Sequence, residues 1–225
     1  SNLLKSLALS PDGKYVVSSS GDKTIKLLNV ALRKEVRTIR VDSDVASIAF
    51  SPDGNYVVTG DAGRNILVWD FKTWSVVKRL SHSGQGNSIT EVVFLPDGKH
   101  VLSSEYGDFL YCWDVQEGTL QWKLKVQRPT TAINVGVHIA VSTNGEKVAV
   151  GSHFEQTPGK KISFIDIYTI ASRKLIASLK EIPDCEIVDI AFSQDEKNIV
   201  TATTEKVLVL DVRKNKIIKE IPLGA

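Results

Sequence analysis

The sequence predicts an all-β protein made of repeated four-stranded antiparallel units. A short apolar segment followed by a tight polar turn occurs five times. Counted from Ser10, these turns recur after 41, 44, 47 and 51 residues, and self-similarity at such a period indicates a repeat architecture. No segment shows a convincing 3.6-residue period. The five turns are Ser10–Gly13, Ser51–Gly54, Leu95–Gly98, Ser142–Gly145 and Ser193–Glu196.

The first repeat shows how each unit is built. Its turn combines Pro11, which pre-sets φ at the first corner, with Asp12, which can bond its own backbone, and Gly13, which accepts a positive φ. The inner segments are continuously apolar, as in strands buried on both faces, whereas the last one alternates like a half-exposed edge strand. The expected strands are Leu3–Leu9, Tyr15–Ser20, Thr24–Val30 and Glu35–Arg40.

The later repeats follow the same order. Their third strands are expected to end in Val68–Phe71, Cys112–Val115, Phe164–Ile167 and Val209–Val212. Their fourth strands are expected at Val76–Leu80, Leu120–Leu124, Leu175–Leu179 and Ile217–Ile221. Short strands separated by turn signals at this regular spacing indicate antiparallel all-β units.

A Trp-Asp pair closes the third strand of repeats two and three, at Trp69-Asp70 and Trp113-Asp114. With the preceding Ser-Pro-Asp-Gly-type turns, this pattern resembles the WD-repeat family of β-propellers along the whole chain. Leu28, Ile165 and Leu210 replace the Trp in the other repeats, and repeat five is also similar to YVTN-type propeller repeats. The resemblance implies one propeller domain over residues 1–225, with blades at about 1–44, 45–88, 89–136, 137–186 and 187–225.

The number of blades in the ring is left open by the sequence. It could be a closed five-bladed ring or five blades of a larger, seven-bladed one. An open arc would expose two apolar blade faces, which is a liability for aggregation or a surface for a partner. The chain contains no Met and begins Ser1-Asn2, which suggests a segment of a longer protein.

WD-repeat blades often share a hydrogen-bond network of a leading His, a Ser or Thr on the second strand, a corner Asp and the Trp. Only fragments are visible here. Asp22 fits the corner of repeat one and His82 the leading His of repeat three, but Gly63 and Gly107 occupy the corner where the Trp is present. We therefore expect the blades to depend mainly on apolar packing.

The composition limits the function classes. Of 225 residues, 42% are hydrophobic and the net charge is +2, which gives no general case for a nucleic-acid or membrane-surface protein. No apolar run approaches the roughly 20 residues of a membrane span. Two cysteines make no disulfide framework, no Asn-x-Ser/Thr sequon occurs and the start shows no signal peptide. We expect an intracellular, cytoplasmic protein, with the nucleus left open.

Differences in loop length point to one rim of the propeller. The Pro-Asp-Gly-type turns barely change in length, while four connections on the other rim are enlarged. These are Ser81–Ser88, Lys125–Gly136, Ser152–Lys160 and Lys180–Glu186. Binding residues are concentrated on loops held by a rigid scaffold, although exposed loops also drift in length without function. The sequence thus nominates the long-loop rim as the interaction face.

The candidate residues on this rim carry charges of both signs, which suit a protein partner better than a phosphate backbone. Phe154 and Tyr106 are the candidate aromatic anchors, although either could instead fold back onto its blade. A solvated charged rim is the simpler interpretation of any single charge. The partner-binding candidates are Gln85, Asn87, Tyr106, Arg128, His153, Phe154, Glu155, Lys160, Lys161, Asp184 and Glu186.

No catalytic, metal-binding or cofactor-binding motif is evident. The histidines His82, His100, His138 and His153 lack metal-ligand spacing, Cys112 is expected in the core and Cys185 as a loop thiol. The recurrent aspartates Asp70, Asp114, Asp166 and Asp211 are interpreted as structural. We therefore expect a non-catalytic scaffold without a cofactor, which binds a protein or peptide within a multiprotein complex.

Two alternatives remain at this stage. A small molecule or metal could bind in the central channel through Ser43, Asp44, Ser88, Asn134 and Glu186. Alternatively, Arg128, Lys160 and Lys161 could bind nucleic acid or a phosphoinositide. The glycines of Ser83–Asn87 could free backbone N–H groups for a phosphate, but the segment lacks the lysine of a Walker loop.

Overall fold

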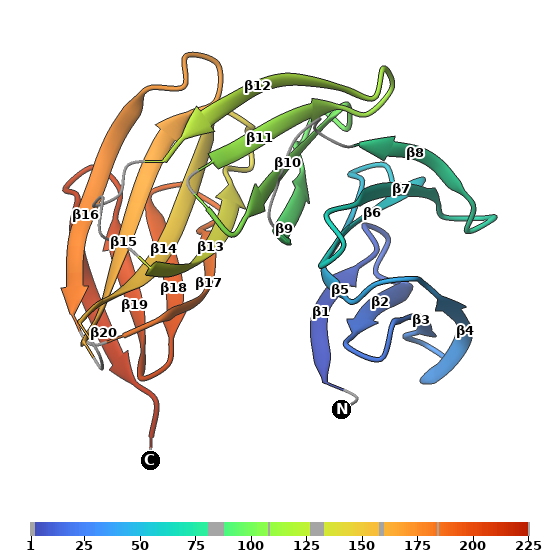
Figure 1. Cartoon of the computed structure of the whole chain (residues 1–225). Coiled ribbons are helices and arrows are strands. Elements are labelled where there is room, and N and C mark those ends of the chain that lie inside the picture. Colours follow the sequence, from blue (N-terminus) through green and yellow to red (C-terminus); the bar gives the residue numbers. More distant parts are fainter. Residues whose placement is uncertain are drawn as a thin grey trace. The chain divides into compact units, whose positions relative to one another are not determined.

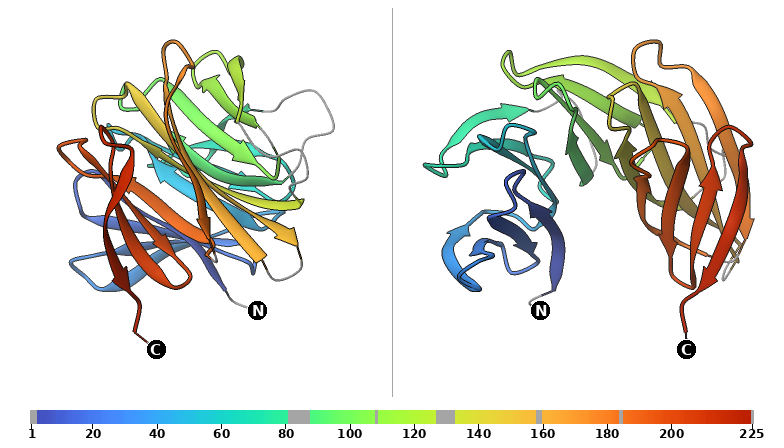
Figure 2. Two further views of the ribbon diagram at one scale, coloured as in Figure 1. Left: turned by 90° about the vertical axis from the view of Figure 1, so that its left-hand side faces the viewer. Right: turned by 180° about the vertical axis from the view of Figure 1, so that it is seen from behind.

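The computed structural model describes residues 3–80, 88–107, 109–126, 133–157, 160–183 and 185–224. Within these ranges the chain forms twenty β-strands and no helix. Each run of four consecutive strands makes one antiparallel sheet in which every strand lies beside the next one in sequence (Figures 1 and 2). The all-β fold of four-stranded blades, in five copies, is confirmed.

The strands of the first three blades are five to seven residues long. Blade 1 comprises β1 (Leu4–Leu9), β2 (Tyr15–Ser20), β3 (Thr24–Asn29) and β4 (Lys34–Arg40). Blade 2 comprises β5 (Val45–Phe50), β6 (Tyr56–Asp61), β7 (Ile66–Asp70) and β8 (Val76–Leu80). Blade 3 comprises β9 (Ile89–Phe94), β10 (His100–Glu105), β11 (Phe109–Asp114) and β12 (Thr119–Lys125).

Blade 4 is longer than the others, with strands of nine to eleven residues. It comprises β13 (Ile133–Val141), β14 (Lys147–Thr157), β15 (Lys160–Thr169) and β16 (Leu175–Pro183). Blade 5 returns to the shorter form with β17 (Ile187–Phe192), β18 (Asn198–Thr203), β19 (Lys206–Asp211) and β20 (Lys216–Pro222). Outside blade 4, the predicted strand ends differ from the observed ones by at most one residue.

The chain divides into two compact units. One consists of residues 1–105 and 109–123, and the other of residues 106–108 and 124–225. Each unit has its own apolar core, and each core lies between neighbouring blades. In the first unit, Val17, Ile25 and Leu27 of blade 1 pack with Val45 and Ile48 of blade 2.

The same arrangement recurs between the later blades. Val58, Ile66 and Val68 of blade 2 pack with Ile89 and Val92 of blade 3. In the second unit, blade 4 contributes Ala149, Ile165 and Ile167, and blade 5 contributes Ile187 and Ile190. Thus one face of each of these blades receives the first strand of the blade that follows it.

The close approach of that first strand requires a small residue on the blade beneath. A Cβ atom added to Gly60 in β6 would lie 2.3 Å from Cγ2 of Ile89, far inside van der Waals contact. Gly151 of β14 is in the same position relative to Ile187, with a distance of 3.1 Å. Any larger residue at Gly60 would therefore push β9 away from its blade.

Two hydrogen bonds of the family network are present. The indole N–H of Trp69 donates to the Thr59 hydroxyl at 3.0 Å, and that of Trp113 donates to the Ser103 hydroxyl at 2.9 Å. The corner positions where WD-repeat blades often carry an Asp hold Gly63 and Gly107. The buried acids instead end the second strands, where Asp61 accepts from the Asn65 backbone and Glu105 accepts from the Tyr111 hydroxyl.

The recurrent aspartates are structural, as predicted. Asp70, Asp114 and Asp211 each accept the backbone N–H three residues further on, at 2.7–2.8 Å, and so shape the turn between the third and fourth strands. Asp166 is buried in β15 and accepts from the Ser178 hydroxyl of β16 at 2.5 Å. These carboxylates are therefore used within their own blades.

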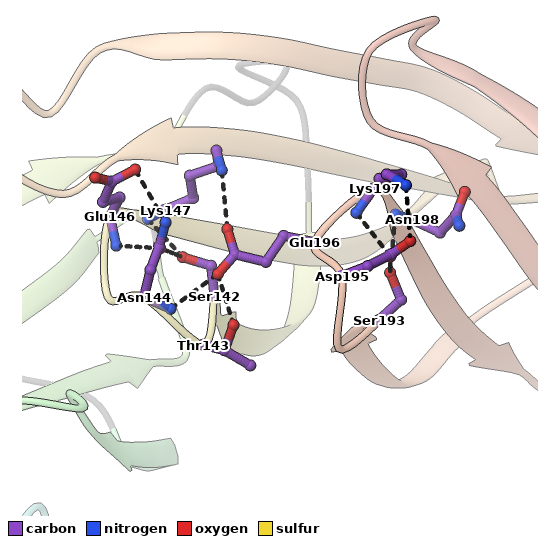
Figure 3. A network of polar contacts seen from close by, with 10 residues as sticks. All are labelled: Ser142, Thr143, Asn144, Glu146, Lys147, Ser193, Asp195, Glu196, Lys197 and Asn198. Carbon is purple, nitrogen blue, oxygen red and sulfur yellow. Dashed lines mark hydrogen bonds and ion pairs between the residues drawn. The ribbon is translucent and has the colours of Figure 1, made fainter.

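A glutamate joins the turns of blades 4 and 5 (Figure 3). Glu196 occupies the turn position that glycine holds in the other repeats and adopts a φ of 56°. Its carboxylate accepts from the Thr143 hydroxyl at 2.7 Å and the Asn144 backbone at 2.8 Å, and pairs with Lys147 at 3.1 Å. These hydrogen bonds, that of Thr143 above all, lower the pKa of the Glu196 carboxyl.

We predict that Glu196→Gln lowers the urea unfolding midpoint at pH 7 and that the difference from wild type shrinks in acid. A lowered pKa in the folded state means that the stabilisation is complete above the ordinary glutamate pKa of about 4.3 and is lost as the pH falls through the lowered value. Unfolding midpoints at pH 7 and pH 3 test this. Glu117→Gln, in the exposed turn between β11 and β12, is the control. A Glu196→Gln effect of equal size at both pH values would contradict the assignment.

Candidate functional site

The nominated rim of blade 4 is built from strand rather than loop. The Ser152–Lys160 segment, expected as a loop, continues β14 to Thr157, and β15 begins at Lys160. Strand likewise extends into two of the other three expected loops, since β13 begins at Ile133 and β16 runs to Pro183. The loop assignment was therefore wrong for residues 133–136, 152–157 and 180–183.

The pairing of β14 with β15 gives the physical reason. Phe154 lies opposite Ile162, and Glu155 lies opposite Lys161. Aromatic and β-branched residues that face each other across strands favour continued pairing. The alternation of His153, Phe154 and Glu155 carried this signal in the sequence. We refer to residues 153–157, 160–163 and 181–183 as the blade 4 extension.

Phe154 is not an exposed anchor. Its side chain is only 3% exposed and stacks on Phe164, with ring centroids 5.3 Å apart and an interplanar angle of 12°. Ile162, its cross-strand neighbour, is also buried. Since successive side chains of a strand alternate between faces, a residue placed at the surface by a loop assignment turns inward here. Phe154 therefore supports the extension instead of contacting a partner.

Lys161 and Glu186 are brought together at the surface. Lys161 Nζ lies 2.5 Å from Glu186 Oε1, with side chains 44% and 32% exposed. The hydrogen bond from Lys161 is the main cause of a lowered pKa for the Glu186 carboxyl. A pair this exposed contributes little stability, about 0–1 kcal/mol. Its main effect is to fix the position of two opposite charges at the edge of the extension.

A histidine pair lies beside these charges. The rings of His138 in β13 and His153 in β14 stack with centroids 6.4 Å apart. Burial lowers the pKa of His138, the neighbouring His153 lowers it further, and Asp189 opposes both effects. The neutral form of the His138 imidazole is thus favoured near neutral pH.

Tyr106 remains the aromatic candidate at the surface. It lies in the corner between β10 and β11 and is 55% exposed. Its neighbour Glu105 is buried and accepts the Tyr111 hydroxyl at 2.7 Å, which fixes the end of β10. Burial, and after it the hydrogen bond to Glu105, raises the pKa of Tyr111 well above its usual value. Tyr106 thus projects from a fixed strand end.

Several candidates lie outside the described part of the structure. These are Gln85, Asn87, Arg128 and Asp184, together with the Ser83–Asn87 segment considered for phosphate binding and His82. Glu155 and Lys160 are placed by their backbones in β14 and β15, and their side chains are not described.

The channel candidates make local contacts. The Ser88 hydroxyl donates to the Ala62 carbonyl at 3.0 Å, and the Asp44 carbonyl accepts from the Ala62 backbone at 2.9 Å. Glu186 belongs to the pair with Lys161. Among the described residues, no group of three or more His, Cys, Asp or Glu is arranged to hold a metal ion. The described segments also contain no helix suited to crossing a bilayer.

Both cysteines are buried. Burial raises the pKa of Cys112 to about 12, in agreement with its predicted core position. Cys185 was expected as a loop thiol but is 1% exposed and packs in the core between blades 4 and 5. The reason is that Cys185 lies two residues before Ile187, the first residue of β17, which enters the same core.

We predict that Phe154→Ala lowers the free energy of unfolding by about 3–5 kcal/mol, the usual range for a phenylalanine removed from a core. Tyr106→Ala, at the exposed corner, is expected to change it by less than about 0.5 kcal/mol. Urea denaturation followed by circular dichroism measures both. Equal effects of the two substitutions would contradict the assignment of Phe154 to the core.

Comparison with known proteins identifies the repeats. The family model described as WD domain, G-beta repeat, matches residues 1–29, 33–70 and 74–114. No curated protein matches the sequence. Among solved structures, a chain of Kuenenia stuttgartiensis hydrazine synthase is similar with a TM-score of 0.82 at 17% identity, over 98% of this chain and 75% of that one. In all, 1670 solved chains match, so the architecture is widespread and does not select a function.

Proposed function

The chain contains WD repeats in residues 1–114 and belongs through them to the WD-repeat family; on this premise we propose that it is a non-catalytic interaction scaffold. The proposed binding surface is the rim that carries the blade 4 extension, the Lys161–Glu186 pair and Tyr106. Its partner is a protein or peptide, held within a larger complex inside the cell. A WD-repeat propeller supports a protein-interaction role in general, and the surface is the finer proposal.

The observation that carries the proposal is the extension itself. Blade 4 continues its sheet beyond the length of the other blades, with β14 at eleven residues and β15 at ten. Phe154 and Phe164 stack beneath it, so its backbone is held by pairing and by a core. A surface already ordered before binding loses less conformational entropy when a partner arrives.

The charges on this surface favour a protein partner. Lys161, the described member of the basic cluster considered for phosphates, is already paired with Glu186 at 2.5 Å. A phosphate group would have to compete with that carboxylate. Paired charges of opposite sign and an exposed tyrosine instead resemble the mixed polar rim and aromatic anchor of protein interfaces.

We predict that Tyr106→Ala combined with Lys161→Glu abolishes capture of the partner from a lysate of the native source. Lys161→Glu places two acids side by side, and Tyr106→Ala removes the exposed ring. The matched control is Lys14→Glu with Lys99→Glu, which changes two exposed lysines in the Ser-Pro-Asp-Gly-type turns of the opposite rim. The captured protein is identified by mass spectrometry and its affinity for each purified variant is then measured.

The proposal requires that the partner binds the wild type and the turn variant and is lost from the rim variant. Equal affinity for all three proteins would contradict the assignment of the surface. A steep loss of affinity between two ionic strengths, with nucleic acid in the captured material, would instead support the phosphate-binding alternative.

A further inference from the structure

A histidine lies in the contact between blades 4 and 5. His138 of β13 is paired with Gly151 of β14, so the two residues are on the same face of the sheet. Gly151 marks the place where β17 packs, because a Cβ atom there would lie only 3.1 Å from Cγ2 of Ile187. The partly buried His138 also forms a hydrogen bond with the backbone of Ile187. Its ring is therefore held between blade 4 and the first strand of blade 5.

The second histidine lies on the same face. His153 is paired with Gly136, two residues before His138 in β13. Its ring stacks on that of His138 at an interplanar angle of 25°, and its Nδ1 atom is buried. A proton on either ring would place a charge beside the other ring. Burial disfavours the charged form of such a group, and a second charge of the same sign disfavours it further.

Blades 1 and 2 hold a different residue at the position of His138. That position lies four residues before the serine that opens the first turn of the blade, and it is Ser6 in blade 1 and Ser47 in blade 2. The Ser6 hydroxyl accepts the backbone N–H of Ile48 at 3.2 Å, and the Ser47 hydroxyl accepts that of Val92 at 3.1 Å. Histidine changes its charge between pH 5 and pH 8, whereas a serine hydroxyl does not. The contacts of the two serines are thus insensitive to pH in this range.

Charged groups from the neighbouring elements surround the histidine pair. Asp189 of β17 favours a proton on His138, but its carboxylate already accepts the backbone N–H of the next residue at 2.8 Å. Glu186, in the connection before β17, interacts electrostatically with His153 and is paired with Lys161 of β15 at 2.5 Å. Since both carboxylates are engaged elsewhere, they offset only part of the cost of a charged histidine.

We propose that the histidine pair makes the contact between blades 4 and 5 sensitive to pH. A proton taken up by the pair in mild acid loosens β17 from blade 4. The contacts between blades 1 and 2 and between blades 2 and 3, where serine takes the place of histidine, keep their strength. Acidification thus acts on one place in the array of blades and not on the array as a whole.

The direction of the effect follows from the lowered pKa of His138, whose main cause is burial. Above the ordinary histidine pKa of about 6.5, the residue is neutral in the folded and the unfolded chain, and the contact keeps its full stability. As the pH falls below that value, the unfolded state binds the proton first, so stability is lost until the pH passes the lowered pKa of the folded state. At pH 5.5, one such group reduces the folding equilibrium constant by at most about tenfold.

Hydrogen–deuterium exchange of the full chain at pH 7.5 and pH 5.5 tests the proposal. Ordinary carboxyl groups, with pKa values of about 4, stay ionised at both pH values. The protection of the peptide covering β17 is compared with that of the peptide covering β5, the first strand that Ser6 contacts, after correction for the pH dependence of exchange in unfolded chains.

Three variants complete the comparison. His138→Ser installs the residue of blades 1 and 2, and His138→Gln places a neutral amide at the same position. His100→Gln, at the start of β10, is the control for removal of a histidine elsewhere.

Between pH 7.5 and pH 5.5, the wild type and His100→Gln should lose protection of β17 by up to about tenfold, while β5 keeps its protection. Both His138 variants should protect β17 equally at the two pH values, even if they lower its protection at each. An equal loss in β5 and β17 would overturn the proposal, because acid would then act on all blades. So would a wild type without any loss in β17, or the full wild-type loss in both His138 variants.

Discussion

The packing of each first strand onto the preceding blade is the interaction on which the rest of this structure depends. A four-stranded antiparallel sheet has two faces, and a blade of six-residue strands cannot bury both by itself. The cores are consequently shared between blades, as where Val17, Ile25 and Leu27 meet Val45 and Ile48. Stability in such an array resembles a sum of nearest-neighbour terms, and a blade without a neighbour retains an exposed apolar face.

This constraint explains where the polar residues lie. The carboxylates of the third-strand ends serve their own turns, and the Trp69 and Trp113 indoles bond to hydroxyls within their own blades. Few polar groups are therefore needed to join blades. Glu196, in a turn position held elsewhere by glycine, reaches the preceding blade through Thr143, Asn144 and Lys147 (Figure 3).

Much of the fold could be predicted because its signals are local. The five turns and the apolar segments between them predicted the blades, and the recurrent aspartates were recognised as structural. The blade 4 extension was missed because Ser152–Lys160 contains polar residues at alternate positions, which fit a loop as well as a strand. The segment forms a strand because residues 160–163 of β15 pair with it. Phe154 and Cys185 were misplaced for the same reason, since burial depends on the neighbouring element rather than on the local sequence.

The candidate interaction residues differ in how well the sequence alone predicts their environment. Tyr106 could be nominated from its place in a corner, and the structure shows it exposed. The pairing of Lys161 with Glu186 required the fold, because it joins a residue of β15 to one in the connection before β17.

Hydrogen–deuterium exchange followed by mass spectrometry tests the central claim that cover by a neighbouring blade determines the stability of each first strand. The comparison is between the wild type and Gly60→Val, because a side chain at position 60 would meet Ile89 and push β9 away from blade 2. The account predicts faster exchange in the peptide covering β9 of the variant, while the peptide covering β1 keeps its rate. Unchanged protection of β9 in the variant would contradict it.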